Sequence, residues 1–387
     1  MAEVSEKDVL AALGTIIDPD RGGDIVSLGM VSGLAIKGGH VVFAIDVDPE
    51  RGPHLEPLRK AAEAAVHALP GVLTVSAVLT AERAAGGDHG HDHGHDHGHG
   101  HGHGHDHGHS HGHGPAAEAP LLPDVKAIIA VASGKGGVGK STTAVNLALA
   151  LKAMGLSVGM FDADIFGPSQ PRMLGVSGAQ PTSPDGDSIN PIEAYGMKVM
   201  SIGFLVPEDS PVIWRGPMVM GALEQMMRQV RWGALDVLVV DMPPGTGDTQ
   251  LTMTQRVPLT GAVIVSTPQD IALLDARKGL NMFRQVNVPV MGIIENMSYY
   301  TCPNCGHEAH IFGHGGAKFE AVKLSTDFLG EVPLDIDIRT TSDEGQPIVV
   351  SKPESPHAKA YKDIAAKVWD KVQLLQQSRK GPKIVME

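Results

Sequence analysis

One short stretch constrains the fold more than any other: SGKGGVGKST, residues 133–142, which directly follows the apolar run AIIAVA. It matches the pattern G-x-x-x-x-G-K-[ST] at Gly134, Gly139, Lys140 and Ser141. The apolar run predicts a strand, and the residues after the loop have the apolar spacing of a helix. A glycine-rich turn between a strand and a helix lets backbone N–H groups surround phosphate oxygens. The chain is therefore predicted to bind a nucleotide.

From residue 123 to residue 387 the chain alternates between short β-rich runs and helical patterns. The predicted strands include KAIIAVA, LSVGMFDAD, LDVLVVDMPP, GAVIVSTP and PVMGIIENM. This order predicts an α/β fold with a doubly wound, mainly parallel sheet, whose ligands bind at the carboxyl ends of the strands. Residues 1–83 instead predict a small α+β domain, with helices at Glu6–Leu13 and His54–Leu69, an alternating strand pair between them and a last strand.

Residues 84–122 separate the two predicted domains and are rich in histidine, glycine and aspartate. Thirteen of the 20 histidines lie between Asp88 and Gly114. Because that stretch has no apolar residue, it cannot offset the entropy cost of ordering, and we predict a disordered linker. Neutral imidazoles suit nickel, zinc, copper and cobalt, so metal binding and a passive tether are equally open roles.

The net charge of the chain is −13, and no clustered Lys/Arg face stands out. Binding to a nucleic-acid backbone needs such a face, so nucleic acid is not an expected partner. No apolar run approaches the ~18 to 20 residues that span a bilayer, and the N-terminal sequence MAEVSEKDVL lacks the pattern of a signal peptide. We therefore expect a cytoplasmic location and no membrane partner.

The glycine-rich loop carries a second lysine, Lys135. With it, KGGVGKST resembles the deviant Walker A family, which includes ParA/MinD partitioning ATPases, nitrogenase iron protein and arsenite ATPase. The resemblance implies that Lys135 crosses a dimer interface to contact the partner's nucleotide. Lys140 is then expected to contact the β and γ phosphates of its own ATP, and Ser141 to hold Mg²⁺. Hydrolysis would depend on dimerisation, as it does where an arginine finger acts in trans.

Acidic residues at the ends of predicted strands are expected near the same phosphates. Asp162 and Asp164 follow one strand, where they can position or deprotonate the attacking water and support Mg²⁺. Asp241 ends another apolar run and resembles a Walker B carboxylate that holds Mg²⁺. Gly245, in the switch-like loop after it, can offer its N–H to the γ-phosphate. For Asp248 a role at a turn or helix start is as open as a functional one.

The base of the nucleotide is predicted from two observations. No N-K-x-D guanine signature occurs, which favours ATP over GTP. Asn296 ends a predicted strand where relatives place an adenine-contacting asparagine, although asparagine is also an ordinary turn residue. Lys135, Lys140 and Asp164 are the predicted catalytic residues. The predicted nucleotide- and magnesium-binding residues are Gly134, Lys135, Gly136, Gly137, Val138, Gly139, Lys140, Ser141, Thr142, Asp162, Asp241, Gly245 and Asn296.

The chain has two cysteines, Cys302 and Cys305, in the sequence TCPNCG. In a reducing compartment such a pair indicates a metal or redox site before a disulfide. The motifs DADIFGPS, WRGPM, DMPPGTGD, STPQDIALLDARKG and ENMSYYTCPNCG together resemble the Mrp/ApbC-type iron-sulfur carrier ATPases. Residues 1–83 resemble the PaaD/SufT-type domain that precedes the ATPase in bacterial members, but contain no cysteine. The resemblance implies ATP, Mg²⁺ and an iron-sulfur cluster held by the two cysteines.

A [4Fe-4S] cluster takes four thiolates, so two chains would have to pool their cysteine pairs in a homodimer. Such a dimer would receive a labile cluster from assembly donors and deliver it to apo-proteins, with the first domain docking these proteins. Zinc is the competing interpretation, with Cys302, Cys305, His307 and His310 as ligands, although a second knuckle is missing. The alternative functions are a ParA/MinD-like positioning ATPase with a structural zinc, or a nickel-insertion NTPase.

Overall fold

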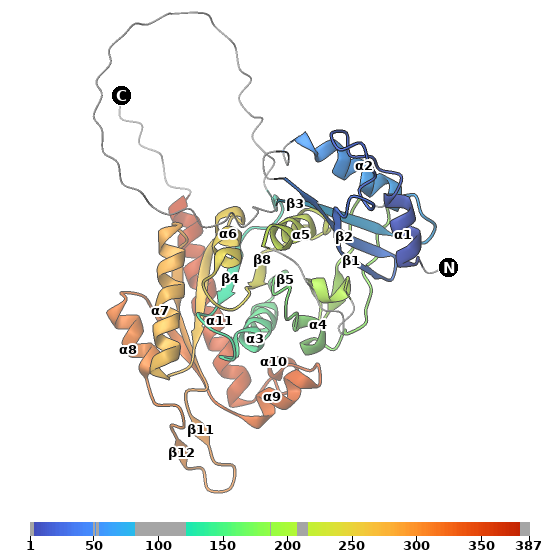
Figure 1. Cartoon of the computed structure of the whole chain (residues 1–387). Coiled ribbons are helices and arrows are strands. Elements are labelled where there is room, and N and C mark those ends of the chain that lie inside the picture. Colours follow the sequence, from blue (N-terminus) through green and yellow to red (C-terminus); the bar gives the residue numbers. More distant parts are fainter. Residues whose placement is uncertain are drawn as a thin grey trace, which may run out of the picture.

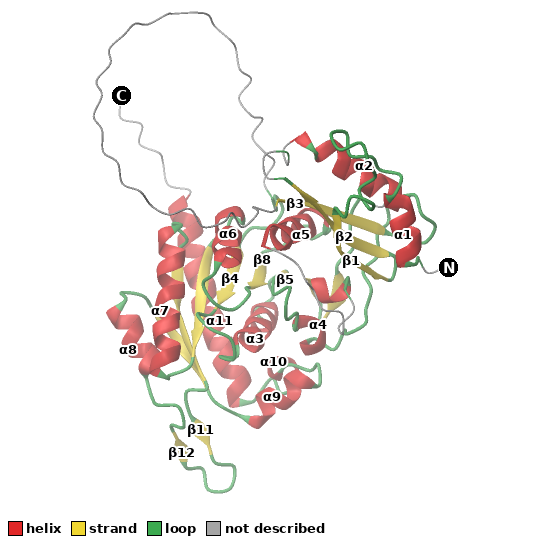
Figure 2. Cartoon of the chain, in the orientation of Figure 1, coloured by secondary structure: helices red, strands yellow, loops and turns green. Residues whose placement is uncertain are grey.

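The computed structural model describes residues 4–48, 51, 54–81, 121–185, 187–206 and 216–379 (Figure 1). The predicted linker lies outside the described residues, apart from its last two positions, and so do Trp214 and Arg215 of the WRGPM motif. Figure 2 shows two sheets of different size, each covered by helices. The larger sheet belongs to the region after the linker and the smaller one to the region before it.

The larger sheet has eight strands within the described residues, in the order β13-β10-β9-β4-β8-β5-β7-β6. Neighbouring strands are parallel except for the pair β6 and β7. Strands β4, β5, β8 and β9 are buried at every residue, as expected for parallel strands with helices on both faces. The predicted doubly wound, mainly parallel fold is confirmed. The strands are β4 (Ile128–Ala132), β5 (Val158–Asp162), β6 (Ile192–Ala194), β7 (Met197–Ser201), β8 (Val237–Asp241), β9 (Gly261–Ser266), β10 (Val290–Asn296) and β13 (Phe328–Val332).

The helices of this region cover the larger sheet (Figure 2). They are α3 (Lys140–Ala153), α4 (Gln170–Met173), α5 (Gly216–Gln229), α6 (Asp248–Arg256), α7 (Asp270–Gln285), α8 (Gly316–Lys323), α9 (Ile336–Asp343), α10 (Ile348–Ser351) and α11 (Pro356–Arg379). The last of them, α11, packs on α3 and β13 through buried Tyr361, Ile364, Val368 and Val372. Its apolar stripe is therefore part of the core. Within the described residues no helix has the length and apolar character needed to cross a membrane.

The smaller sheet has the order β1-β2-β3, with β1 and β2 antiparallel and β2 and β3 parallel. Helix α1 begins with a capping box between Ser5 and Asp8, and α2 begins two residues later than predicted. Both helices cover one face of the sheet around Phe43 and Ile45. The small α+β fold is confirmed. Its elements are α1 (Glu6–Leu13), β1 (Val31–Lys37), β2 (His40–Val47), α2 (Glu56–His67) and β3 (Thr74–Ala81).

The second face of the small sheet packs on the region after the linker, which the sequence did not predict. Val42 and Ala44 belong to the same core as the large sheet. Gly221 of α5 lies so close to β3 that an added Cβ would meet Val78 at 2.8 Å. The imidazole of His40 is buried at this contact, with its Nε2 2.9 Å from the carbonyl oxygen of Pro181. The two regions therefore form one packed body.

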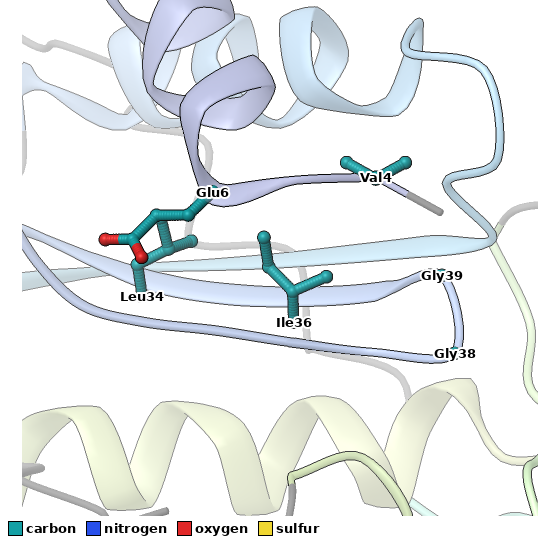
Figure 3. Close-up of a pocket in the computed structure, with 6 residues that line it drawn as sticks. All are labelled: Val4, Glu6, Leu34, Ile36, Gly38 and Gly39. Carbon is teal, nitrogen blue, oxygen red and sulfur yellow. The ribbon is translucent and has the colours of Figure 1, made fainter. Parts of the chain in front are cut away.

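A cleft with a cavity volume of about 260 Å³ lies between the start of α1 and the turn joining β1 to β2 (Figure 3). Only one of the side chains that line it, that of Glu6, is ionisable. We therefore assign no chemistry to this cleft. The lining residues are Val4, Glu6, Leu34, Ile36, Gly38 and Gly39.

Candidate nucleotide site and cysteine hairpin

The phosphate-binding loop joins the end of β4 to the start of α3, at the carboxyl edge of the large sheet. Gly139 has φ +78, which favours glycine, and a Cβ there would lie 2.1 Å from Nδ2 of Asn296. A Cβ at Gly134 would lie 2.1 Å from the backbone carbonyl of Asp275 in α7. Close packing on two sides therefore requires both defining glycines of the motif.

Lys140, Ser141 and Asp241 come together at this edge. The Lys140 ammonium forms an ion pair with Oδ1 of Asp241 and lies 3.1 Å from Oγ of Ser141. Lys140 is 6% exposed and Asp241 is fully buried. The structure thus places the predicted phosphate-binding lysine beside both predicted magnesium ligands, although they come from α3 and from the end of β8.

Asp162 and Asp164 have different surroundings. Asp162 is fully buried, and its Oδ2 accepts hydrogen bonds from the backbone N–H groups of Ser169 (3.0 Å) and Gln170 (3.1 Å) and from Oγ of Ser201 (3.1 Å). Burial, reinforced by the charge of Asp241, raises the pKa of Asp162 to about 7. Asp162 therefore anchors the loop that follows β5.

Asp164 is only partly buried, and its Oδ1 accepts a hydrogen bond from the N–H of Gly167 at 3.2 Å. Burial raises the pKa of this carboxyl group, while the nearby Lys140 charge opposes the shift. A carboxylate with a raised pKa is a stronger base near neutral pH. The pKa of Asp162 is raised as well, but that side chain is fully buried and hydrogen-bonded within the protein. Of the two acids, Asp164 is thus the one that a water molecule can reach for proton transfer.

Gln170 is a site residue that the sequence analysis missed. Its Nε2 donates to Oδ2 of Asp241 at 2.8 Å and to the carbonyl oxygen of Ser141 at 3.1 Å. The side chain is fully buried, and its Oε1 has no hydrogen-bond partner within the described part of the chain. Gln170 therefore links the two predicted magnesium-binding residues. Its only signal in the sequence is a position shortly after DADIFGPS, which does not distinguish it from a surface glutamine.

Two of the predicted nucleotide contacts are engaged within the protein. The N–H of Gly245 donates to the carbonyl oxygen of Ser133 at 3.0 Å, so it is not presented freely to a phosphate. The amide of Asn296 donates to the carbonyl oxygen of Val138 at 2.8 Å and so supports the phosphate-binding loop.

Lys135 and Asp248 are both accessible to solvent. Lys135 is partly exposed, next to the exposed Gly136 and Gly137. Asp248 is the first residue of α6 and follows the N-cap residue Gly247. A carboxylate in the first turn of a helix is stabilised by the helix dipole. This position is consistent with the helix-start role considered for Asp248.

Cys302 and Cys305 lie in the turn of a hairpin formed by β11 (Tyr300–Thr301) and β12 (Glu308–Ala309), which projects from the body of the molecule (Figure 1). Both are free thiols, and Cys305 is exposed. The backbone N–H groups of Cys305 and Asn304 lower the pKa of Cys302, because they donate to its sulfur. The turn thus favours the thiolate form that binds metals.

The four residues of the zinc interpretation do not gather around one point. Among the described residues no group of three or more His, Cys, Asp and Glu side chains could hold a metal ion. His310 instead stacks near His314, with ring centroids 4.1 Å apart, and lies 3.6 Å from a carboxylate oxygen of Glu308. A single-chain zinc site is therefore not assembled in this conformation.

The fold and the loop geometry define a P-loop NTPase that carries a pair of free thiols, one of them exposed. Residues 124–369 match the ParA family model of the NUBPL iron-transfer P-loop NTPases, and the chain belongs to this family. Residues 6–77 match the family model of the iron-sulfur cluster assembly proteins. The resemblance on which the sequence analysis relied is thereby confirmed.

Relatives extend the similarity over nearly the whole chain. An iron-sulfur cluster carrier protein of Synechocystis sp. is 45% identical over 376 residues, 95% of this chain and 97% of the relative. The iron-sulfur cluster carrier protein of Escherichia coli is 57% identical over 244 residues, 63% of this chain and 66% of the relative. A solved nucleotide-binding protein from Archaeoglobus fulgidus, in complex with ADP, is 39% identical with a TM-score of 0.54 and covers 62% of this chain and 93% of its own.

Proposed function

We propose that this chain is an ATP-hydrolysing carrier that holds a labile [4Fe-4S] cluster between the cysteine pairs of two chains and transfers it to apo-proteins. The observation that carries the proposal is the exposed Cys302–Cys305 turn on a P-loop NTPase. Relatives that carry the name iron-sulfur cluster carrier protein support it.

The dimer is supported by ligand number and by the surface near the hairpin. A [4Fe-4S] cluster takes four thiolates, and each chain has two cysteines. Ile311, Phe319 and Val322, which follow the hairpin in sequence, are 57%, 72% and 75% exposed. Large apolar side chains exposed in this way are typical of interaction surfaces. We propose that a second copy docks on this surface and that its cysteine pair meets that of the first chain.

Transfer of the cluster is an exchange of ligands. Each iron–sulfur bond to Cys302 or Cys305 is replaced by a bond to a thiolate of the apo-protein, and the cluster moves without a change in its electron count. The freed carrier cysteines are then open to protonation from water. Cluster ligands that lie in an exposed turn suit this exchange, because an incoming thiolate can approach them.

For ATP hydrolysis we assign the phosphates to Lys140 and the loop N–H groups, and Mg²⁺ to Ser141 and Asp241. Mg²⁺ would supply charge neutralisation at the β and γ phosphates. Phosphate oxygens compete with Asp241 for the Lys140 ammonium, so nucleotide binding would release this carboxylate from its ion pair. Asp164 accepts the proton of the attacking water, and Lys135 acts across the dimer interface.

We also propose residues 1–83, 84–122 and 123–387 as the three segments of the chain, with the first docking donor or client proteins. Its packing against α5 would place a bound client on the ATPase body. The histidines between Asp88 and Gly114 are proposed to bind nickel or zinc. A pull-down that loses no partner when residues 1–83 are deleted would contradict the docking role.

The test is the content of iron, acid-labile sulfide and zinc after anaerobic reconstitution of a chain lacking residues 88–114. We expect about two iron and two sulfide per chain, and none in the Cys302→Ala/Cys305→Ala variant. His307→Ala/His310→Ala is the matched control and should keep the iron and sulfide. One zinc per chain without sulfide would favour the positioning-ATPase alternative instead.

A further inference from the structure

Glu295, the second-last residue of β10, forms hydrogen bonds with residues on both sides of the cysteine hairpin. Its carboxylate is fully buried. Oε1 accepts hydrogen bonds from Oγ of Ser298 at 2.6 Å and from the N–H of Gly315 at 3.2 Å, and Oε2 accepts the N–H of Ala317 at 2.6 Å. Ser298 precedes β11, and Gly315 is the N-cap of α8. One carboxylate therefore ties together both ends of the hairpin segment.

The next residue, Asn296, contacts the phosphate-binding loop. Its Nδ2 donates to the carbonyl oxygen of Val138 at 2.8 Å and lies against Gly139, where a Cβ would approach it to 2.1 Å. Successive side chains of a strand point to opposite sides. Two consecutive residues of β10 thus hold the two functional regions of the chain, one on each side.

The backbone around these two residues leaves little freedom to absorb a movement. Strand β10 is paired on both sides, with β9 and with β13. Met297 has φ +56, a backbone conformation that is uncommon for residues other than glycine. The N–H of Ser298 is held by the carbonyl oxygen of Val332 at 3.0 Å. A displacement of the phosphate-binding loop therefore reaches the hairpin base through fixed contacts.

We propose that Glu295 is a positioning residue that couples the nucleotide state of the phosphate-binding loop to the cysteine turn. Phosphates that reorient the Val138–Gly139 peptide also move the amide of Asn296. The shift at the end of β10 changes the hydrogen bonds from Gly315 and Ala317 to Glu295. The position of the segment that carries Cys302 and Cys305 changes with them. The proposal rests on the proposed function only for the identity of the cargo.

The experiment measures the reactivity of the two thiols, the only ones in the chain. The reduced, cluster-free full chain is treated with a chromogenic disulfide, without nucleotide, with Mg-ADP and with a non-hydrolysable ATP analogue. The protein concentration is one at which its oligomeric state is the same in all three samples. We expect the ATP analogue to change the thiol reaction rate about fivefold in the unaltered chain.

The nucleotide-dependent ratio is the thiol reaction rate with the ATP analogue divided by the rate without nucleotide. Glu295→Gln should bring this ratio close to one, while nucleotide affinity stays within about twofold of the unaltered chain. Glutamine has one acceptor oxygen where glutamate has two, so one of the α8 N–H groups loses its partner. Glu331→Gln is the matched control: Glu331 faces Glu295 in the register of β13 and β10, and this variant should keep the full ratio.

The proposal would be overturned if Glu295→Gln binds nucleotide and still shows the nucleotide-dependent ratio of the unaltered chain. It would also be overturned if nucleotide does not change the thiol reaction rate of the unaltered chain. If Glu295→Gln does not fold, the proposal is tested with Ser298→Ala. This variant removes the 2.6 Å hydrogen bond from Ser298 to Glu295, at only one end of the segment. It should lower the nucleotide-dependent ratio by about half, and an unchanged ratio would exclude the coupling. A chain that shows the coupling but incorporates no iron and sulfide would refute the carrier function alone.

Discussion

Lys140 and Asp241 are almost completely buried, whereas Cys305 is exposed in the turn of a two-stranded hairpin. The nucleotide site is held by side chains from several strands and helices, including Gln170 and Asn296. The cysteine turn is held by backbone hydrogen bonds such as that from the N–H of Cys302 to the carbonyl oxygen of His307, at 2.9 Å. Preorganised, buried charges suit transition-state stabilisation. An exposed turn instead leaves its thiols open to other molecules, which suits ligand exchange.

The largest expected effect concerns the buried ion pair. Lys140→Met should lower the rate of ATP hydrolysis by about 10³-fold, since it removes a positive charge at the γ-phosphate. It should also lower the free energy of unfolding by about 3 kcal/mol, because Asp241 is left buried without its cation. Phosphate release and urea denaturation measure the two quantities.

The double variant Lys140→Met/Asp241→Asn separates the two effects. It removes both charges, so most of the lost stability should return while the rate of hydrolysis stays as low as in Lys140→Met. A double variant that remains as unstable as Lys140→Met would show that the pair contributes little to the folded state. The contrast between a rigid nucleotide site and a loosely held cysteine turn would then be weaker than the buried contacts suggest.

A smaller effect is expected from the titration of Asp162. Its pKa in the folded chain is raised to about 7, above the ordinary value of 3.8. The folded state therefore holds this proton more tightly than the unfolded state, and stability falls as the pH rises from about 4 to 7. Asp162→Asn removes this titration. Relative to that variant, the unaltered chain should lose about 2 kcal/mol of unfolding free energy between pH 5 and pH 8.

The matched control is Asp185→Asn. The side-chain and backbone groups of Ser188, with Arg231 adding to the effect, lower the pKa of Asp185 to about 2, outside the tested pH range. The stability difference caused by this variant should therefore be constant between pH 5 and pH 8. Urea denaturation at three pH values measures both variants. A constant difference for Asp162→Asn would show that its buried carboxyl group is ionised throughout.

The contrast between the buried nucleotide site and the exposed cysteine turn also explains which parts of the structure could be predicted from the sequence. The motif at residues 133–142 and the apolar strands predict the large sheet, because local pattern and buried position coincide there. Gln170 was not predicted, because its importance comes from a contact with Asp241, 71 positions away. The antiparallel strands β6 and β7 and the last strand, β13, were also missed, since they are short and lie in segments without a clear period.

The cysteine turn was predicted as a motif but not as a shape. C-x-x-C gives the ligands, while strands of two residues leave no periodic signal for the hairpin. The packing of the small sheet against α5 was not predicted, because each region has its own pattern of apolar residues. Contacts between the regions before and after the linker produce no periodic signal in the local sequence. Asn296 is predicted to contact adenine, and that contact stays a prediction; the hydrogen bond from its amide to the loop carbonyl of Val138 left no signal in the sequence.

The smallest effect concerns the two thiols themselves. Cys302 accepts N–H donors that lower its pKa, while Cys305 is the more exposed of the two. Because the thiolate is the reactive form, we expect iodoacetamide to modify Cys302 about threefold faster than Cys305 at pH 7, as measured by peptide mapping. The advantage of Cys302 should shrink as the pH rises and thiols ionise without help. Faster modification of Cys305 at every pH would mean that exposure alone governs the reactivity of the two thiols, and that the backbone N–H groups of the turn do not favour the Cys302 thiolate.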